Sequence, residues 1–135
     1  MNIEGEKGDG KAPTFVEKPQ ITPKNDGKLI LMECKVRAKP KPEITWFRDG
    51  THVKETSRIK QTIIEQNDVY IIRLEIHDPH LEDAGLYKCN VKNSAGESNA
   101  NLTLNIERKS FTIGLIFIFS NLFSLIFIFL FAFHF

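Results

Sequence analysis

Two cysteines lie on either side of the one tryptophan of this sequence, at a spacing that few folds share. Cys34 lies twelve residues before Trp46, and Cys89 ends the motif Asp83-Ala84-Gly85-Leu86-Tyr87-Lys88-Cys89. This order, with a tyrosine two residues before the second cysteine, is typical of two antiparallel sheets that pack face to face around the tryptophan ring. Such folds serve mainly in binding and mechanical connection, so catalysis is not the first expectation.

Alternation of apolar and polar residues predicts strands along most of the chain. Ile30, Met32, Cys34 and Val36 share one parity, which is the mark of a half-buried strand. Turn signals separate strands at a spacing of roughly 8–12 residues, as in an antiparallel sandwich. No segment before residue 110 has a convincing helical period. The predicted strands lie near residues 13–16, 29–38, 43–48, 59–65, 70–76, 87–92 and 102–106.

Five residues are predicted to form or support the core. Trp46 is expected to be the largest single burial, because an aromatic ring removes about 150–250 Å² from water. Leu74 and Ile76 lie on the inward parity of their strand. Tyr87 matches the tyrosine corner, whose hydroxyl bonds to the backbone a few residues upstream. Gly85 is expected to provide the backbone freedom of a tight turn.

The sequence also suggests two pairs of side chains that meet in the fold, one of opposite charges and one of cysteines. Arg58 and Asp83 are expected to form a salt bridge across the bottom of the sandwich. Cys34 and Cys89 could form a bridge, and closing a loop of roughly 55 residues would stabilise the fold by ~4 kcal/mol. The N-terminal ten residues have no apolar stretch like that of a signal peptide. A cytosolic domain is therefore expected, and free thiols are favoured there over a disulfide.

The charges favour neither nucleic acid nor a charged substrate. The 18 Lys and Arg residues and the 17 Asp and Glu residues all precede Ser110, and the net charge is +1. Non-specific nucleic-acid binding requires the neutralisation of several phosphates, so no nucleic-acid partner is predicted. The alternating run Lys35, Arg37, Lys39 and Lys41 is expected on a solvated strand face.

No catalytic, cofactor-binding or metal-binding residue is predicted. The sequence has no nucleophile elbow and no glycine-rich phosphate loop. His77, Asp78 and His80 are close in sequence, but a metal site needs three or four convergent ligands and these residues lie at an exposed corner.

Several motifs together resemble one family. They are Pro13 and Phe15, Gly27, Pro40 and Pro42, Trp46-Phe47-Arg48-Asp49-Gly50, Leu74-Glu75-Ile76, the motif from Asp83 to Cys89, and Asn93-x-x-Gly96. Over about residues 12–107 the chain resembles the I-set immunoglobulin domains, and most of all those of the giant muscle proteins twitchin and titin. The resemblance implies an immunoglobulin-like sandwich inside the cell. Its implied partners are neighbouring immunoglobulin or fibronectin-like domains and filament proteins.

The domain is flanked by two segments of different composition. Residues 1–11 are predicted to be a flexible linker, residues 12–107 the domain, and residues 108–135 a phenylalanine-rich tail. Residues 113–133 are long enough to cross a ~30 Å hydrocarbon core as a transmembrane helix. Arg108 and Lys109 would then stay on the cytosolic side, with membrane contact through residues 111–135. The alternative is translation of a T-rich noncoding tract, because Phe, Ile, Leu and Ser dominate this segment.

The sequence thus predicts a non-catalytic structural and interaction module, from a twitchin/titin-like sarcomeric protein in the cytoplasm. The alternative is a membrane-anchored adhesion or receptor-type protein whose signal peptide is missing from this sequence. Oxidised Cys34 and Cys89 and a glycan on Asn101, in the sequon Asn101-Leu102-Thr103, would support that alternative.

Overall fold

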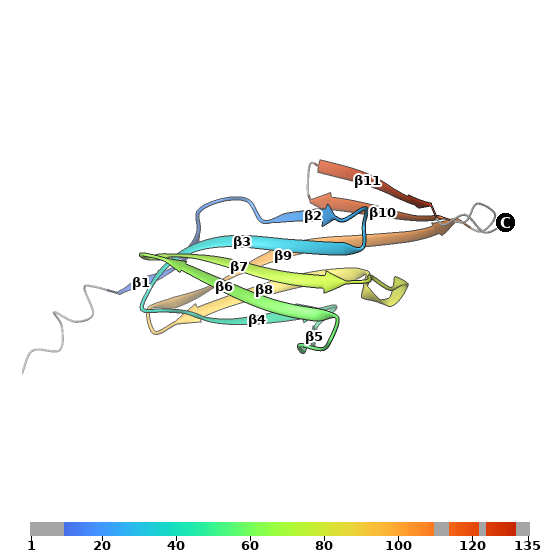
Figure 1. Cartoon of the computed structure of the whole chain (residues 1–135). Helices are drawn as coiled ribbons and strands as arrows, with labels where there is room; N and C mark the ends of the chain where they lie inside the picture. Colours follow the sequence, from blue (N-terminus) through green and yellow to red (C-terminus); the bar gives the residue numbers. More distant parts are fainter. Residues whose placement is uncertain (1–9, 110–113, 122–123, 132–135) are drawn as a thin grey trace, which may run out of the picture.

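Two antiparallel sheets face each other in the computed structural model of the chain (Figure 1). The structure describes residues 10–109, 114–121 and 124–131. The first sheet contains β1 (Lys11–Phe15), β2 (Gln20–Lys24), β3 (Leu29–Lys39), β6 (Ile59–Gln66) and β7 (Val69–His77). The second contains β4 (Glu43–Arg48), β5 (Thr51–His52), β8 (Gly85–Asn93), β9 (Gly96–Lys109), β10 (Gly114–Asn121) and β11 (Ser124–Phe131). This confirms the predicted all-β antiparallel sandwich.

The strand order places the marker residues of the sequence on facing sheets. In the first sheet β3 pairs with β1 and β2 on one side and with β7 on the other, and β6 forms the outer edge. In the second sheet the order is β11-β10-β9-β8-β4-β5. Trp46 of β4 lies opposite Cys89 of β8, whereas Cys34 lies opposite Ile72 in the first sheet. The core therefore forms between the cysteine-bearing strands.

The core follows from period-two alternation. In β3 the side chains of Ile30, Met32, Cys34 and Val36 are all buried, and the residues between them are partly exposed. Since successive side chains of a strand point to opposite faces, one parity fills the space between the sheets and the other meets solvent. Trp46 is 1% exposed and is among the largest buried side chains.

Three short elements lie between the predicted strands. β2 contains Pro23 and pairs with β3, and a proline is tolerated there because a strand paired on one side does not need every N–H for the ladder. β5 consists of two exposed polar residues, so its sequence has no alternation to detect. The 3-10 turn η1 (Leu81–Asp83) occupies the predicted corner.

The first and last strands of the domain run past its predicted limits. β1 begins at Lys11, one residue inside the predicted linker, and β9 extends to Lys109. The rest of that linker, residues 1–9, lies outside the described residues. β1 begins at one end of the sandwich and β9 leaves at the opposite end (Figure 1).

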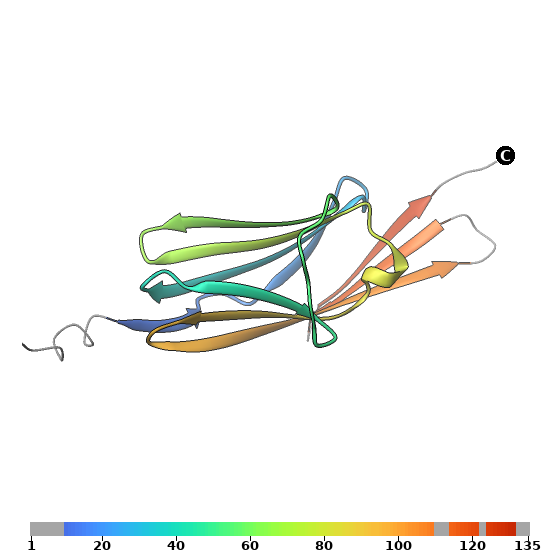
Figure 2. The ribbon, with the colours of Figure 1, turned by 90° about the horizontal axis from the view of Figure 1, so that it is seen from below.

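The tail differs from the predicted helix. β10 and β11 pair with each other, and β10 also pairs with Thr103–Lys109 of β9, most of which continues past the end of β8 (Figure 2). Ile and Phe have high β-propensity, which is a physical reason for strands here. In the described part of the chain no helix is long and apolar enough to span a bilayer. Residues 110–113, 122–123 and 132–135 lie outside the described part, and the membrane anchor itself stays a prediction.

We predict that Trp46→Ala lowers the free energy of unfolding by about 3–5 kcal/mol, because it removes a large buried ring from a closely packed core. Leu86→Ala is the matched control, since Leu86 is 48% exposed. Denaturant unfolding of both variants measures the effect. A Trp46→Ala midpoint equal to that of the control would contradict this core assignment.

Candidate functional site at the two ends of the sandwich

Asp83 is only 1% exposed. Among the side chains that the structure describes, it is the one buried charged residue. Its partner is Arg58, as the sequence suggested. Arg58 Nη1 lies 3.0 Å from Asp83 Oδ2, and Arg58 Nη2 lies 3.3 Å from Asp83 Oδ1. The two roughly parallel contacts are the bidentate arrangement that a guanidinium favours with a carboxylate. The pair joins the start of β6 to the corner before β8.

Further donors complete the surroundings of this buried carboxylate. The backbone N–H of His80 donates to Asp83 Oδ2 at 2.6 Å, and Arg48 Nη1 lies 3.8 Å from Oδ1. Arg58 Nη1 also donates to the carbonyl oxygens of His77 and Asp78, at 3.2 and 3.1 Å. The hydrogen bond to Asp83 raises the pKa of Arg58 and outweighs the opposing effect of desolvation. A buried charge with this many partners fixes the geometry of the corner.

Tyr87 ties the same corner to the core. Its side chain is fully buried, and its hydroxyl donates to the backbone carbonyl oxygen of Asp83 at 2.5 Å. Burial raises the pKa of Tyr87 to about 12, although a hydrogen bond with Arg48 acts in the opposite direction. The acceptor lies four residues upstream, where the tyrosine-corner prediction places it.

The surroundings of Gly85 leave no space for a Cβ. It is half-buried at the start of β8, rather than inside a turn or in the core. A Cβ at this position would lie 2.5 Å from Asp49 Oδ2, and its φ is +149°. The Asp49 side chain occupies that space because Oδ1 accepts a hydrogen bond from the Leu86 N–H at 2.9 Å. Gly85 thus allows the β4–β5 turn to approach β8.

At the other end of β8, Asn93 connects three segments through one side chain. Its Nδ2 donates to the carbonyl oxygens of Lys11 and Pro40, at 2.8 and 3.0 Å. Its Oδ1 accepts from the N–H groups of Ala95 and Gly96, at 2.9 and 3.1 Å. The amide thereby uses its donors and its acceptor to hold β1 and the β3–β4 connection against the β8–β9 turn.

Two contacts complete this attachment of β1. Ser98 Oγ donates to the carbonyl oxygen of Pro13 at 2.6 Å. A Cβ at Gly96 would lie 2.8 Å from Ala12 Cβ, so only glycine permits β1 to approach β9 this closely. Asn93 and Gly96 belong to the Asn93-x-x-Gly96 motif, but the sequence did not reveal what they hold. Lys11 lies 82 residues before Asn93 in the chain, and Pro40 lies 53 residues before it.

The two cysteines are free thiols in the structure, and both are buried. A hydrogen bond with the Cys34 side chain and burial both raise the pKa of Cys89 well above its ordinary range. A buried thiol that keeps its proton is a poor nucleophile and acts as a small apolar group. Leu74 and Ile76, the other predicted core residues, are 1% and 0% exposed.

The histidines near the corner contact neighbouring carboxylates. His77 Nε2 lies 2.9 Å from Glu75 Oε1, and His80 Nδ1 lies 3.3 Å from Glu82 Oε1. Within the described ranges, no group of three or more His, Cys, Asp or Glu side chains has an arrangement that could hold a metal ion.

Comparison with known proteins identifies the family. The family model "Immunoglobulin I-set domain" matches residues 13–106. Since this match covers more than half of the chain, the chain belongs to the immunoglobulin I-set family. The resemblance drawn from the sequence motifs is thereby confirmed.

The relatives include muscle proteins of much greater length. The chain is 31% identical over 108 residues to the muscle M-line assembly protein unc-89 of Caenorhabditis elegans, a match over 79% of this chain and 1% of that protein. The structure of titin M4 is similar with a TM-score of 0.61 and 27% identity, over 71% of this chain and 96% of that one. The twitchin kinase region of C. elegans is similar with a TM-score of 0.57 and 28% identity, over 70% of this chain and 16% of that one. The chain spans only a small part of the length of the curated relatives it matches.

We predict that Tyr87→Phe flattens the alkaline loss of stability. Between the ordinary pKa of 10.0 and about 12, folded Tyr87 keeps a proton that the unfolded chain releases. Rising pH therefore favours unfolding, by up to about 1.4 kcal/mol per pH unit for this one group. The free energies of unfolding of the wild-type chain and the variant should converge between pH 10 and 12. Parallel curves over that range would contradict this role of Tyr87.

We predict that Asn93→Ala lowers the free energy of unfolding by about 1–2 kcal/mol, since it removes four hydrogen bonds to the backbone, of which the one from Gly96 is half-buried and the others are exposed. Asn90→Ala is the matched control on the same strand. Asn90 is half-buried like Asn93, but its amide bonds to the exposed Glu97 and Asn99 side chains of the neighbouring strand rather than to distant backbone, so its loss should cost less than about 1 kcal/mol. Equal losses in thermal or denaturant unfolding would argue against an anchoring role for Asn93.

Proposed function

We propose that this chain is a non-catalytic structural and protein-interaction module of a twitchin/titin-like muscle protein. The observation that carries the proposal is the attachment of its first strand. β1 enters at one end of the sandwich, is held there by Asn93 and Ser98, and lies far from the end where β9 leaves. A domain of this form can be joined head to tail with others in a linear array.

The surroundings of the polar residues support a structural role. The buried Asp83 carboxylate is bonded to Arg58, and the Cys89 thiol keeps its proton. Neither group is poised for proton transfer or nucleophilic attack, because each is committed to an internal partner. The muscle relatives support placement among filaments in the cytoplasm. On this proposal the partners are adjacent immunoglobulin or fibronectin-like domains and filament proteins.

An apolar tail favours a second candidate. Residues 111–135 carry no Lys, Arg, Asp or Glu, as a membrane anchor would require. The second candidate is a membrane-anchored adhesion or receptor-type immunoglobulin protein. The two candidates place the same domain in different locations, so one experiment separates them.

We predict that the full chain with an N-terminal fluorescent tag localises to sarcomeric striations in cultured striated muscle cells. The matched control ends at Lys109 and should give the same pattern, because the proposed contacts lie in the domain. Membrane staining that disappears in the shortened chain would favour the anchored candidate. Diffuse fluorescence with both chains would contradict the sarcomeric assignment.

A further inference from the structure

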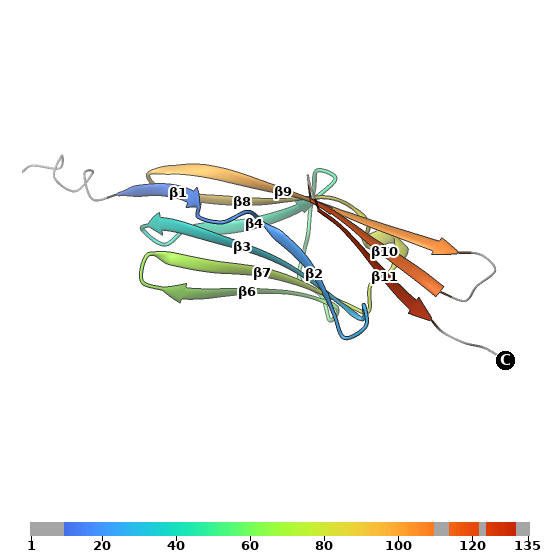
Figure 3. The same ribbon diagram turned by 90° about the horizontal axis from the view of Figure 1, so that it is seen from above.

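β6 forms an outer edge of the first sheet, with β7 on its only paired side (Figure 3). An edge strand presents every second backbone N–H and C=O away from its partner. The N–H groups of Ile59 and Gln61 in β6 are bonded outside the sheet, so these two residues direct their backbone groups away from β7. Because the direction alternates along a strand, Ile63 and Glu65 do the same. The edge is therefore a row of backbone hydrogen-bonding groups that faces away from the domain.

Half of this row is covered by the preceding segment of the chain. The Ile59 N–H donates to Thr56 Oγ1 at 3.1 Å, and the Thr56 N–H donates back to the Ile59 carbonyl at 3.0 Å. The Gln61 N–H donates to Glu55 Oε1 at 2.7 Å. The exposed Glu55 side chain thus takes the place that a neighbouring strand would occupy.

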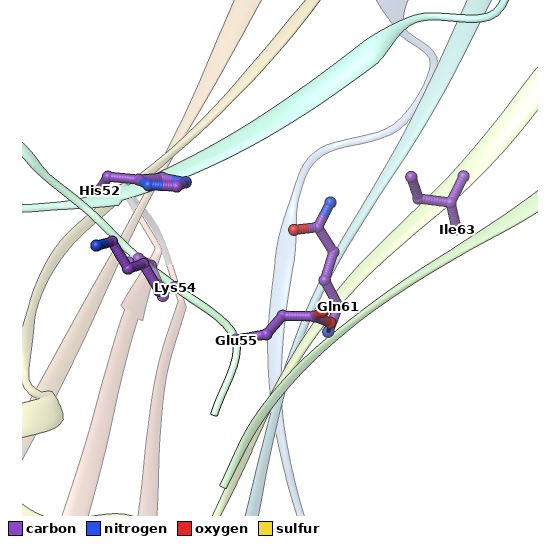
Figure 4. A pocket seen from close by; sticks show the side chains of 6 residues that line it. His52, Lys54, Glu55, Gln61 and Ile63 are labelled. Carbon is purple, nitrogen blue, oxygen red and sulfur yellow. Dashed lines mark hydrogen bonds between the residues drawn. The ribbon is translucent and has the colours of Figure 1, made fainter. Parts of the chain in front are cut away.

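The second half of the row lies beside an open hollow. His52, Val53, Lys54 and Glu55 line one side of it, and Gln61 and Ile63 line the other (Figure 4). Ile63 lies on the inward parity of β6, with Ile59, yet it is 36% exposed. The cause is the shortness of β5, which has two residues and leaves no strand in the second sheet to cover Ile63. Apolar surface and unpaired backbone groups therefore occur together at this edge.

The sequence of β6 is complementary to a second copy of itself. In an antiparallel pairing centred on Ile63, that residue faces its own copy, and Gln61 faces Glu65. Thr62 then faces Ile64, and Lys60 faces Gln66. No like charges are opposed, the two exposed isoleucines cover each other, and an amide meets a carboxylate. Such cross-strand pairs are favourable, whereas directly opposed like charges are not.

We propose that two copies of this chain associate through their β6 edges in this antiparallel register, and that Glu55 competes with this association. For pairing, the Gln61 N–H exchanges its bond to Glu55 for the carbonyl oxygen of Glu65 in the second copy. The hydrogen bonds of the pair centre on the Ile63 backbone. The inference does not depend on the muscle assignment of the domain.

Sedimentation equilibrium of the full chain, in a mild detergent that solvates residues 111–135, tests the proposal. The wild-type chain should show a reversible monomer–dimer equilibrium. Glu55→Ala should tighten it about thirtyfold, because the symmetric pair is relieved of one competing hydrogen bond of about 1 kcal/mol in each of its two copies. Ile63→Lys should abolish it, since a charged side chain on an inward edge position opposes strand addition. Leu86→Lys is the matched control, as Leu86 is exposed on the other sheet, and it should leave the equilibrium unchanged.

A second variant tests the register and remains informative if Ile63→Lys fails to fold. Paired residues that exchange both backbone bonds lie about 5.5 Å apart at Cα, within the range of a disulfide. Ile63→Cys should therefore form a cross-linked dimer under mild oxidation, and Leu86→Cys should not. A Glu55→Ala chain that stays monomeric, or an Ile63→Cys chain that cross-links no more than the control, would overturn the proposal.

Discussion

The structure depends on one apolar layer between two sheets, centred on Trp46. Alternate side chains of β3, β4, β7 and β8 fill this layer. The burial of that layer is the main favourable term available to a domain without a disulfide in the structure. The polar contacts at the ends of the sandwich form only when this apolar layer is packed. Tyr87 reaches the Asp83 carbonyl only because its ring is held in this core.

Polar groups fix the two ends of the layer. At one end the buried Asp83 carboxylate meets Arg58 and the corner backbone. At the other end Asn93 bonds to β1 and to the β3–β4 connection. A buried carboxylate such as that of Asp83 specifies geometry more than it adds stability, because desolvation offsets much of its attraction to Arg58. The Asn93 contacts determine where the chain enters the sandwich, and the Asp83 contacts fix the corner before β8.

The layered core could be predicted from the sequence because period-two alternation is local. The parity of β3 and β7, and the position of Trp46, follow from residues only a few positions apart. Arg58 and Asp83 could be proposed as a pair, but Asn93 could not be assigned its partners. Its bonds to Lys11 and Pro40 depend on how distant segments meet in three dimensions. The sequence also could not predict that β6 is an edge strand, since only the sheet order shows that one side of this strand is unpaired.

Hydropathy alone does not predict whether the apolar tail forms a helix or strands. An apolar run long enough for a membrane helix is equally rich in residues with high β-propensity. In the structure Gly114–Asn121 and Ser124–Phe131 are strands that extend the second sheet from β9. Length and hydropathy alone do not distinguish the two outcomes, because strand pairing depends on an available neighbouring edge.

β1 is expected to unfold only together with the core, and native-state hydrogen exchange measures whether it does. The Val16 N–H, just beyond β1, donates to the Lys35 carbonyl at 3.0 Å. This amide should exchange with a free energy of opening close to that of the β7 amides, as expected for groups released only by global unfolding. Exchange of Val16 through a local opening several kcal/mol below the β7 value would show that β1 detaches independently, and would contradict the account.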